Sequence, residues 1–123
     1  MTRILLVEDD DDVREMVYQI LTREGYEVEQ TANGRLALES FQKNPADLVI
    51  TDLIMPEKEG LEMIRDLVNG YTGVKIIAIS GGGRLDPGDY LRTARVFGAR
   101  KTIHKPFGRS ELLDTVKAVL EEK

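Results

Sequence analysis

The chain has 123 residues, a size at which one domain can fold without disulfide bonds or bound metal. Hydrophobic residues make up 41% and charged residues 32%, which excludes a disordered tail or a collagen-like repeat. With no cysteine and one histidine, it cannot hold disulfides, iron–sulfur clusters, or thiolate or multi-histidine metal sites. A net charge of -5 argues against direct binding of nucleic acid. No apolar run is long enough for a membrane span or signal peptide, so we expect one cytoplasmic domain over residues 1–123.

Apolar periodicity along the chain predicts strands that alternate with helices. Short apolar runs predict strands at residues 4–7, 26–29, 48–50, 74–79 and 102–104. Apolar residues at helical spacing predict helices at residues 13–21, 36–41, 61–68, 86–97 and 112–120. The breakers Gly25, Gly70 and Gly98 follow three of these helices, and an Asp-Pro pair opens the fourth. Such alternation predicts a mostly parallel sheet with helices on both faces, joined by right-handed crossovers.

The composition of each strand predicts its place in the sheet. The strands around Ile4, Leu48 and Ile76 are almost wholly apolar, as central parallel strands are. Those around Val28 and Ile103 are more polar, so we expect them at the two edges.

Polar side chains follow four of the predicted strands where each strand ends. Glu8 and Asp9 follow the first, Asp52 the third, Ser80 the fourth and Lys105 the fifth. Ligands of open α/β sheets bind beyond the carboxyl ends of the strands, so we expect these side chains to meet there. Singly, each has a plain structural alternative: helix N-terminal acids, turn residues or a solvated lysine. Because all of them follow strand ends of one sheet, we favour a shared functional site over these separate alternatives.

The residue types at this edge point to phosphoryl chemistry. Clustered carboxylates repel one another unless a cation lies between them, and hard oxygen donors favour Mg²⁺. A carboxylate beside Mg²⁺ can attack a phosphoryl group and form an acyl phosphate. The ammonium of Lys105 and the hydroxyl of Ser80 could then bind the oxygens of the transferred group.

Four motifs carry a resemblance over essentially the whole length of the chain. They are ILLVEDD at residues 4–10, DLVITDLIMP at 47–56, IAISG at 77–81 and KPF at 105–107. In this order and spacing the sequence resembles the receiver domain of two-component response regulators. The resemblance implies a doubly wound, flavodoxin-like (βα)5 fold with a parallel sheet of order 2-1-3-4-5.

The resemblance also assigns roles to the acids at the predicted edge. It implies that Asp52 is the phosphoacceptor and that Asp9 binds Mg²⁺ directly, with Glu8 acting more through water. The backbone carbonyl of Ile54 matches the third protein ligand of the family.

The resemblance assigns roles in the switch to two further residues, and the sequence departs from the family pattern in two places. Ser80 matches the hydroxyl residue that moves toward the phosphoryl group, and Lys105 matches the lysine that pairs with a phosphoryl oxygen. The bond between Lys105 and Pro106 resembles one that is usually cis in the family. Thr102 occupies a position that is aromatic in many members, so transmission of the switch is expected to differ. The glycine-rich loop at 81–88 is longer than expected, either as a tolerated insertion or as an altered switch loop.

The function implied by the resemblance is a phosphorylation-dependent signalling switch rather than a multiple-turnover enzyme. A sensor histidine kinase or phosphotransfer protein would phosphorylate Asp52, and water would later hydrolyse the acyl phosphate. The sequence ends just after the last predicted helix, so output would pass through a downstream protein unless the chain is a fragment. The fourth helix, fifth strand and fifth helix form the expected partner face, for a monomer or weak homodimer. No membrane partner is expected.

Two alternatives remain beside this interpretation. A degenerate receiver would bind partners without phosphorylation, a reading for which Thr102 leaves some room. A Mg²⁺-dependent phosphohydrolase would want a second aspartate two positions after the nucleophile, where this chain has Ile54. Crowding of carboxylates in the metal-free state also predicts that Asp9→Ala or Asp52→Asn raises the melting temperature.

Overall fold

The computed structural model describes residues 1–53, 59–80, 95 and 98–122. Its elements in chain order are β1 (Arg3–Val7), α1 (Asp11–Arg23), β2 (Glu27–Thr31), α2 (Gly34–Lys43), β3 (Leu48–Asp52), α3 (Glu59–Gly70), β4 (Ile76–Ser80), β5 (Lys101–His104) and α5 (Arg109–Glu121). Apart from Arg95, which is helical, the helix expected over 86–97 lies outside the described residues, as do the Ile54 carbonyl and the loop 81–88.

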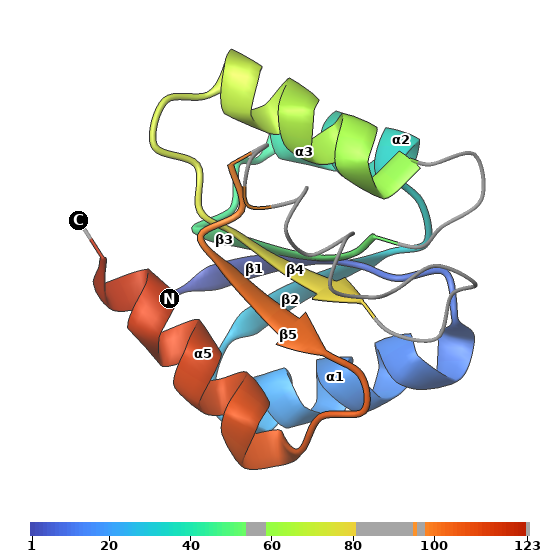
Figure 1. Cartoon of the computed structure of the whole chain (residues 1–123), viewed down its shortest axis with the longest axis vertical. Helices are drawn as coiled ribbons and strands as arrows, with labels where there is room; N and C mark the ends of the chain where they lie inside the picture. Colours follow the sequence, from blue (N-terminus) through green and yellow to red (C-terminus); the bar gives the residue numbers. More distant parts are fainter. Residues whose placement is uncertain (54–58, 81–94, 96–97, 123) are drawn as a thin grey trace.

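The strands form one parallel sheet of order β2-β1-β3-β4-β5, as predicted. Every residue of β3 and β4 is buried, and β1 is buried after its first residue. The edge strands β2 and β5 carry most of the exposed strand positions, which confirms the assignment from polarity. Parallel pairing brings the carboxyl ends of all five strands to one edge of the sheet (Figure 1).

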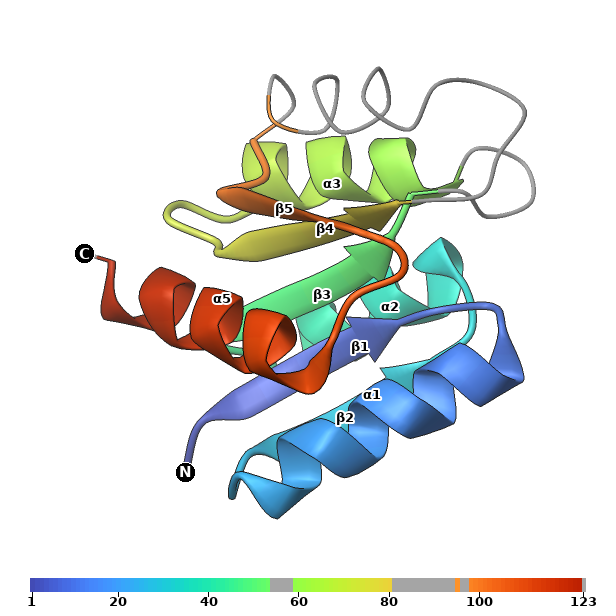
Figure 2. The same ribbon diagram turned by 60° about the horizontal axis from the view of Figure 1, so that its bottom comes forward.

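Helices cover both faces of the sheet and bury two apolar clusters. Helices α1 and α5 lie on one face, and α2 and α3 lie on the other (Figure 2). Because side chains alternate along a strand, Ile4 and Leu6 of β1 face α1 and α5, while Leu5 and Val7 face α2 and α3. Each central strand therefore contributes to both clusters, which explains why these strands are apolar throughout.

The acidic run after β1 divides into two parts with different roles. Asp10 is the N-cap of α1, and its Oδ1 accepts hydrogen bonds from the amides of Asp12 and Val13 at 2.9 and 3.2 Å. Asp11 and Asp12 lie in the first turn, where negative charge suits the helix dipole. These three acids therefore stabilise the start of α1, and Glu8 and Asp9 are the acids of the run that remain for the site.

One predicted strand begins later than expected. The apolar run 74–79 suggested a strand from Val74, but β4 starts at Ile76. Gly73 turns the chain with φ of +75°, and Val74 then packs against the cluster shared with α2 and α3. The apolar character of Val74 therefore serves packing rather than strand pairing.

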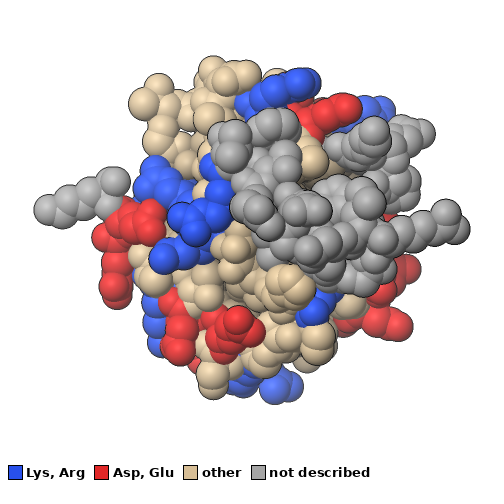
Figure 3. Space-filling view, in the orientation of Figure 1, with Lys and Arg blue, Asp and Glu red and all other residues tan. Residues whose placement is uncertain are grey.

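The described surface mixes charges of both signs. Figure 3 shows a group of Lys and Arg side chains beside a group of Asp and Glu near the C-terminal end of α5. One contact there joins Arg100 to Glu122 at 3.1 Å. None of the described helices combines the length and apolar character needed to cross a membrane.

Candidate functional site

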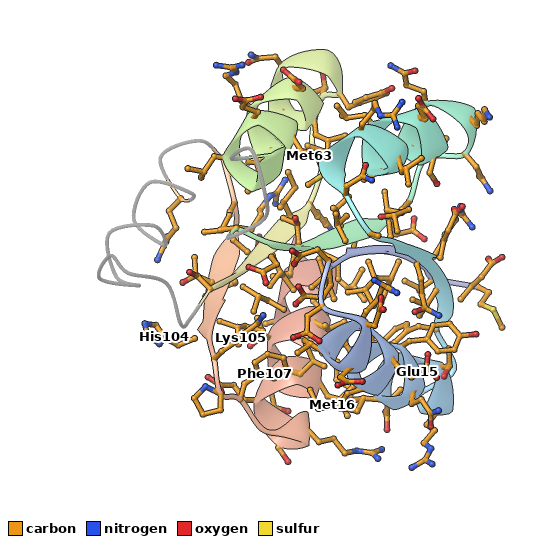
Figure 4. The ribbon with its side chains drawn as sticks, turned by 90° about the vertical axis from the view of Figure 1, so that its right-hand side faces the viewer. Glu15, Met16, Met63, His104, Lys105 and Phe107 are labelled. Atoms are coloured by element: carbon orange, nitrogen blue, oxygen red, sulfur yellow. The ribbon has the colours of Figure 1, made fainter. Side chains whose placement is uncertain are left out.

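The sheet register brings the predicted site residues to one edge. Val7 pairs with Thr51, Asp52 with Ile79, and Ser80 with His104, so the strands end at similar heights. Glu8 directly follows β1, Asp52 ends β3 and Lys105 directly follows β5. In Figure 4, His104 and Lys105 point to opposite sides of β5, with Lys105 toward the neighbouring strand ends.

Three carboxylates form the acid cluster of this edge: Glu8, Asp9 and Asp52. One oxygen from each lies within 4.8 Å of the others. Glu8 is 3% exposed and Asp52 is 5% exposed, whereas Asp9 is open to solvent. Buried carboxylates are costly without a partner of opposite charge or a metal ion, so their burial here requires compensation.

Lys105 supplies part of that compensation. Its Nζ donates to Glu8 Oε1 at 3.0 Å and to Asp52 Oδ2 at 2.7 Å. The backbone holds it there, because its amide donates to the Ser80 carbonyl at 2.8 Å. The Lys105–Pro106 peptide bond is cis, as the resemblance implied. One ammonium thus joins strand ends that lie far apart in the sequence.

Burial beside Asp52 changes the titration of Glu8, and the two acids change that of Lys105. Burial, a hydrogen bond to Asp52 and the negative charge of Asp52 raise the pKa of Glu8 to about 8, against the opposing effect of Lys105. Burial alone would lower the pKa of Lys105, but hydrogen bonds and charges from Asp52 and Glu8 outweigh it and raise that pKa. At neutral pH without metal, Glu8 therefore keeps its proton and Lys105 keeps its charge.

Ser80, Thr102 and His104 differ in their surroundings. Ser80 is fully buried, and its hydroxyl has no hydrogen-bond partner in the described part of the chain. Thr102 is half-buried and pairs with Ala78 across β4 and β5. His104 is exposed and points to the side of β5 opposite Lys105.

The donor set of the acid cluster fits a hard divalent cation. All three ligating groups are carboxylates, which suit Mg²⁺ and are poor ligands for soft metals. Asp9 faces solvent and leaves room for the waters that Mg²⁺ keeps, while Glu8 and Asp52 close the buried side. These are the residues that could hold such an ion.

Two further residues border the site and were not singled out from the sequence. Arg14 donates from Nη1 to the Glu8 carbonyl at 2.8 Å. Gly60 lies so close to the end of β3 that an added Cβ would sit 2.7 Å from the Asp52 carbonyl oxygen. The spacing of Asp11 and Arg14 hinted at a helical ion pair, but nothing in the sequence pointed to Gly60.

Comparisons with known proteins agree on one family. A family model described as the response regulator receiver domain matches residues 4–117. The response regulator receiver protein CpdR of Brucella abortus is 36% identical over 98% of both chains. Sporulation initiation phosphotransferase F of Bacillus subtilis is 31% identical over 98% of this chain and 95% of its own. The crystal structure of a putative response regulator from Chloroflexus aurantiacus superimposes with a TM-score of 0.88, at 30% identity over 98% of both chains.

Proposed function

The chain belongs to the response regulator receiver domains of two-component signalling, and from this membership we propose that it is a switch operated by phosphorylation of Asp52. Receiver domains are signalling domains and are not in general enzymes that turn over an external substrate. They typically use Mg²⁺. The observation that carries the proposal is the buried Asp52, held against Lys105 within the acid cluster.

In the proposed reaction, a carboxylate oxygen of Asp52 attacks the phosphorus of a phosphohistidine. A P–O bond forms, the P–N bond breaks, and the imidazole nitrogen leaves with the electron pair and takes a proton from solvent. Glu8, Asp9 and Asp52 are the residues that would hold a cation, which would supply positive charge to the phosphoryl oxygens. The carbonyl of Ile54 is proposed as a further ligand, by the resemblance alone.

Lys105 and Ser80 are proposed to bind the phosphoryl oxygens after transfer. Lys105 already lies 2.7 Å from an oxygen of Asp52, so its ammonium can follow the charge onto the new group. Ser80 offers a buried hydroxyl that lacks a partner among the described residues, which is a donor ready for a new acceptor. A phosphoryl oxygen that accepts this hydrogen bond would bias the protein toward an active state.

The phosphoryl donor is proposed to be a sensor histidine kinase or a phosphotransfer protein. The relative from Bacillus subtilis is named as a phosphotransferase, which supports a role in transfer between proteins. Output is proposed to pass to a downstream protein in the cytoplasm, through the face that includes β5 and α5.

Intact-protein mass spectrometry after incubation with acetyl phosphate, with and without Mg²⁺, tests the central claim. We expect a gain of one phosphoryl group that requires Mg²⁺ and disappears in Asp52→Asn. Asp66→Asn, which removes an exposed acid of α3, is the matched control and should still be phosphorylated. No gain in the folded native chain would contradict the proposal and favour the degenerate receiver, for which the non-aromatic Thr102 leaves some room.

A further inference from the structure

Arg14 lies on the first turns of α1, directly behind the turn that carries Glu8 and Asp9. Its side chain is 18% exposed, which is low for an arginine near a helix start. Its Nη1 donates to the Glu8 carbonyl at 2.8 Å, and its Nη2 donates to Asp11 Oδ1 at 2.5 Å. The guanidinium therefore spans the turn between β1 and α1.

The contact with the Glu8 carbonyl fixes the peptide plane between the two acids. The preceding peptide group is held as well, because the Glu8 amide donates to the Thr31 carbonyl of β2 at 3.0 Å. The peptide group that joins Glu8 to Asp9 is planar, so holding its carbonyl also sets the direction in which Asp9 leaves the strand. The amide of Asp10 then bends back toward Glu8 Oε2 at 3.4 Å.

We propose that Arg14 is a positioning residue for the divalent cation of the acid cluster, acting by holding the Glu8–Asp9 peptide rather than by touching the ion. This inference rests on the proposed function, because it concerns the same metal site. A planar guanidinium suits the task, since it can donate to the carbonyl and to the Asp11 carboxylate at once.

Charge and positioning predict opposite effects when Arg14 is replaced. As a nearby positive charge, Arg14 repels a cation, so its removal would tighten Mg²⁺ binding. As a positioning residue it orients the ligands, and loss of such outer contacts weakens metal binding by about 10- to 100-fold. The sign of the change therefore separates the two roles.

The test is the Mg²⁺ dissociation constant of the full chain, measured by isothermal titration calorimetry. We expect Arg14→Gln to weaken Mg²⁺ binding about tenfold. Arg23→Gln is the matched control, since it removes the same charge from an exposed position in the last turn of α1. It should change the constant by less than about twofold, because exposed and distant charges are screened.

A second variant and a metal-free measurement separate positioning from simple loss of folding. Arg14→Lys keeps the charge but cannot span both acceptors, so we expect an intermediate weakening of Mg²⁺ binding. Without Mg²⁺, the amides of Asp12 and Val13 should exchange hydrogen faster in Arg14→Gln than in the native chain, and no faster in Arg23→Gln. If Arg14→Gln does not fold, Arg14→Lys carries the comparison.

Each outcome decides a different claim. Native affinity or tighter binding in Arg14→Gln, with clear Mg²⁺ binding by the native chain, overturns the role of Arg14 alone. Wild-type affinity in Arg14→Lys would mean that the paired contacts of the guanidinium are not needed, and would also overturn it. Absence of Mg²⁺ binding by the folded native chain would overturn the metal site of the proposed function, and this inference with it.

Discussion

At the scale of single residues, the surroundings of Glu8 change its acidity. It is almost fully buried beside a second carboxylate, and its pKa is raised to about 8. In the unfolded chain the same carboxyl titrates near its ordinary value of 4.5. Between these two values the folded state holds a proton that the unfolded state has released, so the free energy of unfolding falls as pH rises across this window.

The direction of this pH dependence can be tested in the absence of Mg²⁺. Raising the pH from 5 to 8.5 should destabilise the native chain relative to Glu8→Gln by on the order of 4 kcal/mol, because the glutamine carries no titrating proton. Urea unfolding of both proteins in EDTA at several pH values measures this difference. Glu39→Gln, at an exposed position of α2, serves as the control. Parallel pH profiles for the native chain and Glu8→Gln would contradict the assignment.

At the scale of elements, a lysine outside α5 caps its C-terminal end. Lys75 Nζ donates to the carbonyl oxygens of Leu120 and Glu122 at 3.0 and 2.6 Å. Carbonyls at a helix C-terminus lack intrahelical partners and carry the negative end of the helix dipole. Lys75 therefore ties the end of α5 to the segment that enters β4.

Replacement of Lys75 should loosen this end of α5. We expect Lys75→Met to lower the free energy of unfolding by about 1 kcal/mol, because two carbonyls lose a charged donor. Lys117→Met, at an exposed position of α5, should change it by less than about 0.5 kcal/mol. Chemical denaturation of the three proteins measures both effects, and equal losses in the two variants would argue against a cap.

A second element-scale feature is the close approach of α3 to the end of β3. A Cβ on Gly60 would meet the Asp52 oxygen, the Leu53 Cα and the Leu53 oxygen at 2.7 to 2.9 Å. These are backbone atoms, which cannot rotate away as a side chain can. The absence of a side chain at Gly60 is therefore what lets α3 pack against the strand that carries Asp52.

Alanine substitutions at two glycines of α3 should have opposite effects. Gly60→Ala should lower the free energy of unfolding by about 1–3 kcal/mol, the usual cost of overpacking. Gly70→Ala meets no atom within 4 Å and should be neutral or stabilising by up to about 1 kcal/mol. Thermal melts of both variants provide the measurement, and a neutral Gly60→Ala would mean that α3 can shift away without cost.

At the scale of the whole molecule, the sheet brings three carboxylates and one ammonium together at one edge, where a cation would add compensation. A ligand that binds only the folded state stabilises it by about 2.7 kcal/mol at 100 times its dissociation constant. We therefore expect saturating Mg²⁺ to raise the melting temperature by several degrees, and EDTA to reverse the effect.

Variants of the acid cluster should separate crowding from metal binding. In EDTA, Asp9→Ala and Asp52→Asn should melt at higher temperature than the native chain, because each removes one crowded carboxylate. In Mg²⁺, Asp9→Ala should gain little, since it has lost a ligand. Differential scanning calorimetry measures all of these, and a clear drop for both variants in EDTA would contradict a destabilising acid cluster.

The sequence could predict the sheet because its pattern is set by burial. Strands around Leu48 and Ile76 are covered on both faces and must be apolar throughout, whereas β2 and β5 border solvent. The candidate site could be placed because its residues follow strands whose ends coincide in a parallel sheet. Both predictions depend only on the local sequence pattern and on the rule that parallel strands place their carboxyl ends at one edge of the sheet.

Other features depend on distances between segments, which no local pattern records. The pairing of Lys105 with both Glu8 and Asp52, and the raised pKa of Glu8, arise only when three strand ends meet. The close approach of Gly60 depends on the angle at which α3 leaves β3. The start of β4 was missed because Val74 is apolar for packing against helices, not for pairing with β3.

The hydroxyl of Ser80, which has no hydrogen-bond partner among the described residues, has a consequence for stability as well as for the proposed switch. A buried hydroxyl without a partner costs the resting state about 1–3 kcal/mol. Ser80→Ala should therefore melt at higher temperature than the native chain, while under the proposed function its phosphorylated form would lack one contact to the new group. Ser80→Thr, which keeps the hydroxyl, should retain that contact, and a lower melting temperature for Ser80→Ala would contradict this view. Under the proposed function, this serine would exchange stability of the resting fold for a donor to the phosphoryl group.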